Sequence, residues 1–311
     1  MKILITGAGG MLGSYLVEQF KQHEIVSLGL RDDSDFKVDL RKETPDFSDI
    51  AFDTVIHTAG SEDNTNAMEL NLEGTRKLLE ALENHPPENF VYISSNRVYS
   101  RDAGENITEE TNTWASDDTG RSKALAEELL IEWSRRHDIT LTIIRPARMF
   151  GNGVKGETLS LFNDALSGKY IHIRGNDAKV SLVCAYDVAR GIKQVYKKGG
   201  IYNASDGHPV KFIEMVEAMT ANAGYKKRMT HLPAPWAEWI WRLGRWIPSI
   251  QRNLSPETVE TRMKTHTLDG SFFASETGIE YFDTIAVIER RDKNYPYTQG
   301  MVKQNKAVHE V

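Results

Sequence analysis

The first thirteen residues hold the feature that most constrains the fold, an apolar run followed by regularly spaced glycines. Lys2–Thr6 predicts a short buried strand, and Gly7, Gly10 and Gly13 follow it at three-residue intervals. Residues 11–20 then show the apolar spacing of a helix. Glycines between a strand and a helix let the backbone approach a pyrophosphate, which the positive N-terminus of the helix attracts. The segment predicts a dinucleotide-binding turn, with an ordinary tight turn as the alternative.

Strand-like and helix-like patterns alternate up to about residue 150. Each predicted strand is a nearly continuous apolar run, which is typical of strands covered on both faces. The predicted strands are 2–6, 25–30, 53–59, 90–94 and 141–145, and the predicted helices are 11–20, 68–82 and 122–136. This alternation predicts an α/β fold built on a doubly wound parallel Rossmann sheet.

The alternation loosens after about residue 150, where glycines and aromatic residues become more frequent. We therefore expect a Rossmann domain at 1–165 that is completed by residues 182–205. A smaller C-terminal substrate domain is expected at 166–181 and 206–290. Residues 291–311 form a polar tail, which we expect to be frayed.

The composition narrows the possible partners and the location. The 311 residues carry a formal net charge of −6, which argues against nucleic acid as a partner, because phosphate backbones bind basic surfaces. The single cysteine, Cys184, excludes a disulfide framework and a cysteine-ligated zinc site, and the nine histidines show no metal-ligand spacing. No apolar run approaches the length of about 20 residues that crosses a bilayer. We expect a cytoplasmic protein without a metal, with Cys184 in its core.

Seven further segments follow the glycines in a recognisable order. They are Val38-Asp39-Leu40, 55–60 (VIHTAG), 71–81 (NLEGTRKLLEA), 91–99 (VYISSNRVY), 145–151 (RPARMFG), 186–189 (YDVA) and 201–204 (IYNA). Together with the glycines, this series resembles the extended short-chain dehydrogenase/reductase superfamily, and within it the NAD-dependent epimerase/dehydratase group. The resemblance covers roughly residues 1–285 and implies NAD(P) as the cofactor.

The resemblance also implies which residues meet the cofactor. The glycines approach the pyrophosphate, Asp39 faces the adenine, and Lys123 holds the nicotinamide ribose. The full implied set is Gly7, Gly10, Met11, Leu12, Gly13, Arg31, Asp39, Leu40, Thr58, Ala59, Gly60, Asn71, Lys123 and Pro146.

The end of the second predicted strand bears on the choice between NAD and NADP. An NAD enzyme generally places a carboxylate about 20 residues beyond the glycines, where it binds the ribose 2′-hydroxyl. Here Leu30 stands at that position and Arg31 follows it, and an arginine can pair with a 2′-phosphate. The sequence thus slightly favours NADP. A shift of one residue would bring Asp32 into the position typical of NAD, and Arg31 would then be an ordinary surface residue.

The catalytic motif departs from the family at one position. Where the family has Tyr-Gly-x-Ser-Lys, this chain has Thr119-Gly120-Arg121-Ser122-Lys123. The resemblance implies that Ser95 orients a substrate carbonyl and that Thr119 occupies the position of the general acid. A threonine hydroxyl is a much weaker acid than a tyrosine phenol, whose pKa is near 10.

Three neighbouring side chains are alternative proton donors. Tyr99 ends the segment that carries Ser95, and Asp117 and Asp118 directly precede Thr119. Packing is the commoner role for a tyrosine in the place of Tyr99, and helix N-termini favour carboxylates in any case. We expect these structural roles rather than replacement of the missing tyrosine.

The residues after Ser95 narrow the reaction. Sugar 4,6-dehydratases of the family have an Asp-Glu pair there, whereas this chain has Asn96 and Arg97, which disfavours dehydration. Nucleotide-sugar epimerases often have Asn where this chain has Arg148. That arginine either clamps a phosphate or carboxylate of the substrate or is an ordinary surface residue. We take Asn96, Arg97 and Arg148 as the candidate substrate residues.

The resemblance therefore implies an NAD(P)-dependent epimerase or reductase that acts on a sugar-nucleotide or a related hydroxyl or keto compound. Its proton transfer would be impaired or altered at Thr119. The alternative is a catalytically silent NAD(P)-binding protein that senses redox state or binds a partner. A homodimer formed through the helices after residues 68 and 122 is a further expectation.

A tryptophan-rich segment spans residues 235–247. On a helix, one face would carry Trp236, Trp239, Ile240, Leu243 and Ile247, with Glu238, Arg242 and Arg245 opposite. We expect this apolar face to pack on the core of the substrate domain or to form a lid. An interfacial membrane helix is the less favoured alternative.

Overall fold

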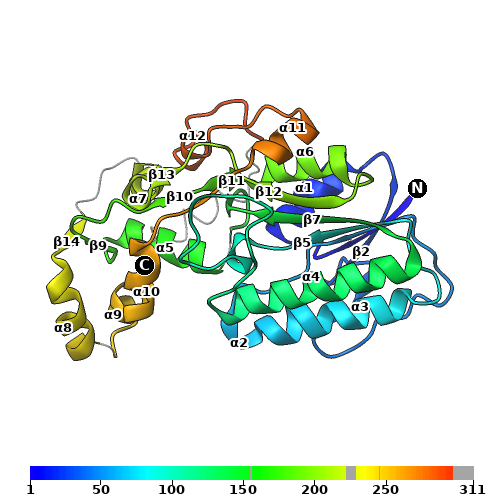
Figure 1. Ribbon diagram of the computed structural model, residues 1–311, viewed down its shortest axis with the longest axis horizontal. Helices are drawn as coiled ribbons and strands as arrows, with labels where there is room; N and C mark the ends of the chain where they lie inside the picture. The colour runs from blue at the N-terminus through cyan, green and yellow to red at the C-terminus, as the bar shows by residue number, and fades with distance from the viewer. Residues whose placement is uncertain (155, 222–228, 245, 297–311) are drawn as a thin grey trace.

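The computed structural model describes residues 1–154, 156–221, 229–244 and 246–296. Its centre is a seven-stranded sheet with the order β12-β7-β5-β4-β1-β2-β3, in which every pair of neighbours is parallel. The strands are β1 (Lys2–Thr6), β2 (Glu24–Gly29), β3 (Phe36–Lys37), β4 (Thr54–His57), β5 (Asn89–Ile93), β7 (Thr140–Pro146) and β12 (Gly200–Ala204). This order confirms the predicted doubly wound α/β fold (Figure 1).

The central strands β1, β4 and β5 are almost fully buried because both faces of the sheet are covered. Helices α1 (Met11–Gln19), α6 (Ala185–Val195) and α11 (Ser271–Thr277) lie on one face, and α3 (Gly74–Leu82) and α4 (Asp118–His137) on the other (Figure 1). Successive side chains of a strand point to opposite faces. Ile3 and Ile5 therefore join the core under the first layer, and Leu4 joins the core under the second. Cys184 is buried in the first core, as expected.

A smaller lobe lies beyond the carboxyl ends of the sheet strands (Figure 1). Its elements are α5 (Gly156–Ser167), β9 (Ile171–Ile173), β10 (Lys179–Val180), β13 (Val210–Lys211), α7 (Phe212–Ala221), β14 (Thr230–Leu232), α8 (Ala234–Gly244), α9 (Pro248–Leu254) and α10 (Pro256–Met263). The remaining elements are β6 (Gly104–Ile107), β8 (Arg148–Phe150), β11 (Leu182–Cys184), β15 (His266–Leu268) and α12 (Thr284–Ile288). Strands β13, β10, β15 and β6 form a second, four-stranded sheet, while β8 pairs with β11 and β9 with β14.

Two helices begin earlier than predicted. The predicted helix at 68–82 is preceded by α2 (Asn64–Ala67), and its first part, Met68–Glu73, is a π-helix that leads into α3. Helix α4 begins at Asp118 rather than at residue 122, because the Asp117 carboxylate caps it by accepting the Gly120 N–H at 2.8 Å. The earlier start puts Thr119 in the first turn of α4.

Residues 291–296 are not a frayed tail, so that expectation is wrong for them. Tyr295 is only 3% exposed, and its hydroxyl lies 3.1 Å from the hydroxyl of Tyr15 in α1. Its ring also packs edge-on against Tyr186 and Phe282. This aromatic cluster holds the segment on the first helical layer. Residues 297–311 of the predicted tail lie outside the described residues.

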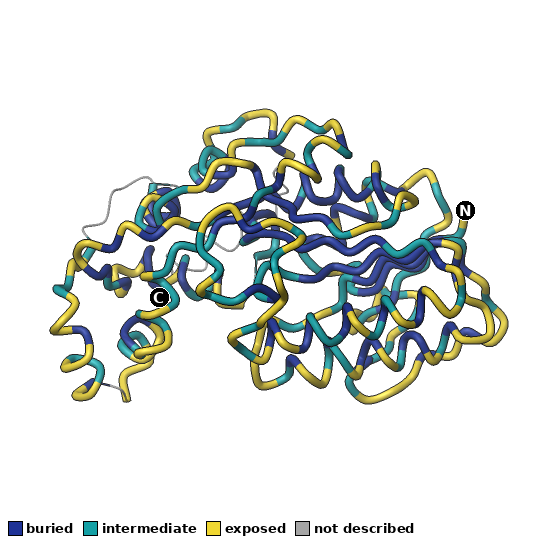
Figure 2. The backbone as a smooth tube through the Cα atoms, in the orientation of Figure 1, coloured by how far each residue is buried: buried dark blue, intermediate teal, exposed yellow. Residues whose placement is uncertain are grey.

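The tryptophan-rich segment forms α8 and the residues after it, but its tryptophan face does not pack on the core. Trp236 and Trp239 are exposed, whereas Ala237 is buried and Ile240 and Trp241 pack inward. Figure 2 shows how much of α8 is exposed compared with the dark, buried strands of the main sheet. The expectation that this face packs on the core is therefore wrong, because the small Ala237 and its inward neighbours make that contact instead. The other expected role, a lid, stays a prediction.

Candidate active site

The strand order places the glycine turn beside a loop from the neighbouring strand. Strands β1 and β4 are adjacent, but the helices that follow them lie on opposite faces of the sheet. Open α/β sheets bind ligands in the crevice at the carboxyl ends of the strands, at such a change of direction. The glycine turn follows β1 there, and Thr58–Gly60 follow β4.

Close packing within the turn requires two of its glycines. Gly7 has a φ of +69°, and a Cβ there would lie 2.8 Å from Thr58 Oγ1. A Cβ on Gly13 would lie 2.2 Å from the Gly7 carbonyl oxygen. The Gly10 N–H donates to the same oxygen at 2.8 Å, which closes the turn directly before α1.

The N-terminus of α1 fits the phosphates of NAD(P). Gly10 stands at its N-cap without a capping side chain, and the first turn holds no acidic residue. The first N–H groups of the helix thus carry positive charge that no carboxylate of the turn neutralises. The Leu12 side chain belongs to the core, and the partly buried Met11 side chain packs against it. Because both side chains are directed to the core, these residues would contact a phosphate through their backbone N–H groups.

Arg31 lies across the glycine turn at the end of β2. A Cβ on Gly9 would lie 2.3 Å from Arg31 Cδ. The guanidinium makes two hydrogen bonds to the Asp33 carboxylate, at 2.9 and 2.7 Å. Arg31 is therefore beside the turn, as the cofactor assignment requires, but its charge is already paired within the loop.

Three other residues implied at the cofactor are engaged by the protein itself. The Asp39 carboxylate accepts two hydrogen bonds from the Arg41 guanidinium, which lowers the pKa of Asp39. Leu40 belongs to the core beneath the second helical layer, and Pro146 is buried at the end of β7. Their contacts with a cofactor stay predictions.

A chain of hydrogen bonds connects β1, β4 and the π-helix beneath the crevice. His57 Nδ1 lies 2.6 Å from Thr6 Oγ1, and its Nε2 lies 2.9 Å from Thr75 Oγ1. The Thr75 hydroxyl donates to the Asn71 carbonyl at 2.6 Å, so Nε2 must be the donor toward Thr75, and Nδ1 accepts from Thr6. Burial lowers the pKa of His57 to about 3, which keeps this one neutral tautomer. The Ala59 N–H donates to Thr6 Oγ1 and so ties the β4 loop to the chain.

Lys123 reaches from α4 to the end of β5. Its ammonium donates to the Ile93 carbonyl at 2.7 Å. Burial lowers the pKa of Lys123 to about 8, against an opposing effect of the Glu62 carboxylate. A Cβ on Gly60 would lie 2.9 Å from Lys123 Nζ and 3.0 Å from Asn71 Oδ1. The structure thus brings Lys123, Asn71 and Gly60 together, three residues that the family resemblance implies at the cofactor.

Ser95 lies two residues beyond the carbonyl that binds Lys123. It caps a short 3₁₀ helix, Asn96–Val98, by accepting the Arg97 N–H at 3.2 Å. Its hydroxyl donates a long bond of 3.4 Å to Asn96 Oδ1. Ser95, Asn96 and Lys123 therefore meet at the carboxyl end of β5.

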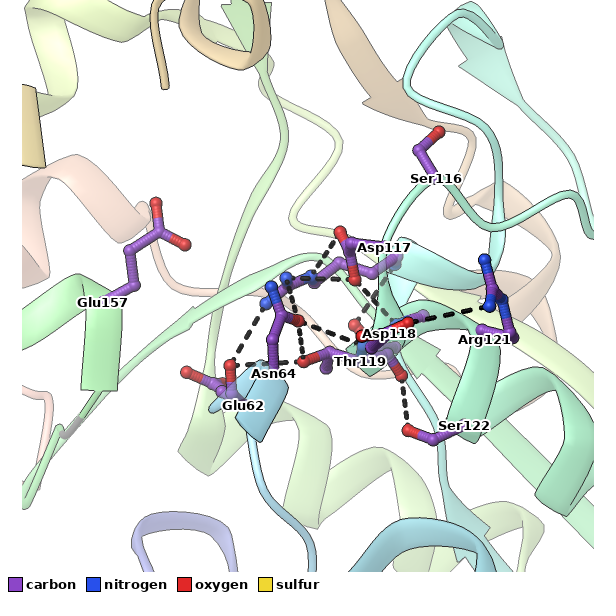
Figure 3. Close-up of polar contacts among 12 residues, drawn as sticks. Glu62, Asn64, Ser116, Asp117, Asp118, Thr119, Arg121, Ser122 and Glu157 are labelled. Carbon is purple, nitrogen blue, oxygen red and sulfur yellow. Dashed lines mark hydrogen bonds and ion pairs between the residues drawn. The ribbon is translucent and has the colours of Figure 1, made fainter. Parts of the chain in front are cut away.

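The Thr119 hydroxyl is used within the protein rather than offered to the crevice (Figure 3). Thr119 is 2% exposed, and its Oγ1 donates to Asn64 Oδ1 at 2.8 Å, with the Glu62 carbonyl oxygen at 3.3 Å. The Thr119 N–H also donates to Asn64 Oδ1, at 3.1 Å. A hydroxyl has a single proton. The Asn64 Oδ1 therefore accepts the only hydroxyl proton of Thr119, the residue at the position of the family's catalytic tyrosine.

Arg97 holds the other side of this cluster. Its guanidinium lies 3.0 Å from the Asp117 carboxylate and 3.4 Å from Asn64 Oδ1. Although burial opposes the effect, Arg97 and the Gly120 N–H lower the pKa of Asp117. Asp117 is thus an ionised cap and not a proton donor. Arg97, taken from the sequence as a substrate residue, is largely occupied by the protein.

The other two alternative donors also have structural partners. The buried Tyr99 hydroxyl donates to Asn203 Oδ1 and accepts from Arg145, each at 2.8 Å. Burial raises the pKa of Tyr99. Asp118 faces Arg121 at 3.7 Å on the side of α4 away from Asn64 (Figure 3). These contacts agree with the structural roles expected for both.

Two residues of the site were missed by the sequence analysis, Glu62 and Asn64. They follow Gly60 at the carboxyl end of β4, and the only signal is the polar run at 61–66. Glu62 is exposed, and a Cβ on Gly156 at the start of α5 would lie 2.9 Å from its Oε2. The β4 loop therefore reaches the smaller lobe.

Arg148 lies in β8, within reach of α5. Its guanidinium donates to Thr158 Oγ1 at 3.1 Å and lies 3.6 Å from the half-exposed Glu157 carboxylate. Both partners belong to α5. Figure 3 shows Glu157 on the same side of the Thr119 cluster as the Glu62 carboxylate. Compared with Arg97, Arg148 has only a long ion pair, so more of its charge is available to an anion.

Comparison with known proteins agrees with this arrangement. Residues 3–205 match the family described as NAD dependent epimerase/dehydratase. The chain belongs to this family. It is 27% identical over 252 residues to the N-acetyl-α-D-glucosaminyl-diphospho-ditrans,octacis-undecaprenol 4-epimerase of Escherichia coli, covering 75% of this chain and 76% of that protein. It is also 27% identical over 273 residues to the UDP-glucose 4-epimerase of Vibrio cholerae, covering 78% and 80%.

A solved structure of the same fold extends the similarity to the smaller lobe. The UDP-glucose 4-epimerase of Thermotoga maritima, crystallised with UDP-glucose, superposes with a TM-score of 0.75 at 16% identity. The match covers 93% of this chain and 96% of that one. The likeness confirms the Rossmann fold and shows that the fold is shared over nearly the whole chain.

Proposed function

We propose that the protein is an NAD(P)-dependent epimerase or reductase of a sugar diphosphate, with proton transfer that differs from the rest of its family. The observation that carries the proposal is the buried Lys123 ammonium, held at the end of β5 beside Ser95 and beneath Gly60. Bound NAD(P) would accept or return a hydride at one sugar carbon. Lys123 would hold the nicotinamide ribose, and Ser95 would orient the substrate carbonyl.

The substrate class follows from what two relatives share. One is named for a sugar on diphospho-undecaprenol and the other for UDP-glucose, so both names describe a sugar joined to a diphosphate. For this chain we propose the same sugar diphosphate group. Arg148 would neutralise part of the diphosphate, because a guanidinium pairs well with phosphate oxygens. Asn96, next to Ser95, would contact the sugar.

Glu62 is our candidate for moving the proton. Its carboxylate is exposed and acts electrostatically on Lys123, whereas the Thr119 proton is held by Asn64. A carboxylate can take a proton from a sugar hydroxyl during oxidation and return it afterwards. Thr119 would then be a positioning residue that fixes the main chain of Glu62.

Three finer assignments complete the proposal. Arg31, at the glycine turn, supports NADP over NAD, with a 2′-phosphate exchanging for Asp33 on the guanidinium. The largely exposed outer surfaces of α3 and α4 would form a homodimer. The free, buried Cys184 is in keeping with a cytoplasmic location.

A second candidate function is a catalytically silent NAD(P)-binding protein that senses redox state. The observation that favours it is the engaged Thr119 hydroxyl, which leaves the acid position without an available proton. The glycine turn and Lys123 would still bind the dinucleotide.

Cofactor titration followed by turnover tests both functions. We expect quenching or enhancement of NADPH and NADH fluorescence on binding, then turnover of UDP-glucose, UDP-N-acetylglucosamine or N-acetylglucosaminyl-diphospho-undecaprenol. Glu62→Gln should lower kcat about a hundredfold without changing cofactor affinity, because it removes an acid-base group. Asp118→Asn, an exposed carboxylate beside Thr119, is the matched control. Cofactor binding without turnover of any of the three would support the silent protein, and no cofactor binding would contradict both functions.

A further inference from the structure

One apolar surface has no role in the candidate active site. It consists of Trp236, Trp239, Leu243, Trp246 and Ile247, which are 63, 69, 79, 81 and 51% exposed, and we call it the Trp face. Eleven large hydrophobic side chains are exposed among the described residues, and five of them belong to this surface. Three of the six tryptophans of the chain lie on it. Single exposed apolar residues are ordinary, but Trp236, Trp239 and Leu243 share one face of α8, and exposed apolar residues grouped in this way mark an interaction surface.

The Trp face is not needed to hold α8 in place. The opposite side of the helix packs on α9, where Gly244 lies so close that a Cβ would be 2.4 Å from Ile250 Cδ1. Trp241 also points inward and donates from Nε1 to Gln251 Oε1 at 2.9 Å. The helix is therefore anchored by one side, and its largest apolar side chains are presented outward.

The stretch of sequence that contains α8 has a net charge of the opposite sign from that of the rest of the chain. Residues 221–254 carry six Lys and Arg against one Asp or Glu, leaving 32 against 43 in the rest of the chain. That single acid, Glu238, is paired with Arg242 at 2.7 Å. A basic segment with exposed tryptophans in an otherwise acidic chain matches a negatively charged lipid surface.

The position and amino-acid types of the Trp face favour a bilayer over a second copy of the chain. Helix α8 lies at the outer end of the smaller lobe, far from α3 and α4, where we propose the dimer contact (Figure 1). A convex helix at one end of a molecule meets a flat surface without any complementary hollow. Tryptophan is enriched at the interface between lipid headgroups and acyl chains. No helix among the described residues is long and apolar enough to cross a bilayer, so the contact would be interfacial.

We propose that the Trp face is an anchor that lays α8 in the headgroup region of an anionic bilayer. Trp236, Trp239 and Leu243 enter the boundary with the acyl chains. Arg242 lies at the level of the lipid phosphates. The smaller lobe, rather than the cofactor-binding sheet, then faces the membrane. This inference does not depend on the proposed catalytic function.

Co-sedimentation of the full chain with vesicles tests the anchor. We expect binding to vesicles of phosphatidylcholine with phosphatidylglycerol, and weaker binding to pure phosphatidylcholine or at high salt. The double variant Trp239→Ser/Leu243→Ser should lose at least about tenfold in vesicle affinity, because two buried apolar side chains are removed. Trp114→Ser is the matched control, since Trp114 is 78% exposed outside the Trp face. Thermal unfolding and NADPH titration check that each variant is folded.

Each other outcome overturns the proposal. Wild-type protein that stays in the supernatant with anionic vesicles contradicts it. So does equal loss of binding in the Trp114→Ser control, which would mean that any exposed tryptophan suffices. Sedimentation velocity detects the alternative occupant. A self-association that the double variant abolishes, with no vesicle binding, would assign the Trp face to a second copy of the chain.

Discussion

The glycine turn and the start of α4 differ in how their polar groups are used. At the glycine turn, the first N–H groups of α1 have no capping side chain and no nearby acid within the turn. At the start of α4, by contrast, Thr119, Asn64, Arg97 and Asp117 bond to one another. Polar groups that satisfy one another gain little from a ligand, whereas unpaired N–H groups gain a great deal. The comparison supports the proposals made above, a dinucleotide bound at the glycine turn and a proton transfer that differs from the family at Thr119.

The largest expected effect comes from the glycine end. Gly13→Ala should weaken NADPH and NADH binding at least about a hundredfold and lower the free energy of unfolding by about 3 kcal/mol, because overpacking of a tight contact strains the backbone. The added Cβ would lie 2.2 Å from the Gly7 carbonyl oxygen. Fluorescence titration and urea unfolding measure the two effects. Gly10→Ala is the control, since its Cβ would lie 3.1 Å from the same oxygen. Equal losses in both variants would show that the turn is generally intolerant rather than closely packed at residue 13.

A tyrosine at position 119 should raise turnover only if the Asn64 side chain, which contacts Thr119, is also removed. Thr119→Tyr alone should lower stability by about 2 kcal/mol and leave turnover unchanged, because a larger side chain is forced into a filled site. Thr119→Tyr/Asn64→Ala should raise turnover about thirtyfold over wild type, since it restores an acid of suitable pKa. Asn64→Ala alone should give no such gain. Full gain in the single Thr119→Tyr variant would show that Asn64 does not occupy the position of the phenol.

The same contrast explains what the sequence could predict. The glycine turn and the strands are local patterns, since buried parallel strands are apolar on both faces and glycines punctuate the turn between them. Local patterns therefore predicted the sheet, whereas Gly60, Asn71 and Lys123 were assigned to the cofactor only through the family resemblance, and their roles stay predictions. The Thr119 cluster joins residues 55 positions apart, as in the bond from Thr119 to Asn64, and no local pattern indicates such a contact.

The orientation of α8 was missed for a related reason. Helical spacing showed that Trp236, Trp239 and Leu243 share a face, but amphipathicity does not say what covers that face. The opposite side carries Ala237 and Gly244, which allow closer approach to α9 than tryptophans would. The small residues Ala237 and Gly244 determine which side of α8 faces α9. An analysis based on the spacing of large apolar residues overlooks such small residues.

A smaller effect is expected from the titration of Lys123, which extends from α4 to the end of β5 and lies close to Gly60. Its pKa is lowered from 10.5 to about 8, so the unfolded chain binds the proton more tightly between these values. The free energy of unfolding should therefore rise with pH across this window, by about 3 kcal/mol at most. Cofactor affinity should fall about tenfold in the same window, as one charge-assisted contact is lost. Lys123→Met should flatten both profiles, and unchanged profiles in the variant would assign them to another group.

The smallest effect is expected at the adenosine end, where the choice of cofactor is decided. Arg31→Ala should weaken NADPH binding about fivefold and leave NADH binding unchanged, because it removes one exposed and solvent-screened charge-assisted pair. The control is Lys37→Ala, which removes an exposed cation from the same end of the sheet, where it pairs with Asp32. Competition titrations of the two cofactors give the ratio directly. If Arg31→Ala strengthens NADPH binding or weakens both cofactors equally, the guanidinium serves Asp33 rather than a 2′-phosphate. The charges of the loop after β2 would then be satisfied within the protein, as in the Thr119 cluster. Of the regions compared, only the glycine turn would keep polar groups available to a ligand.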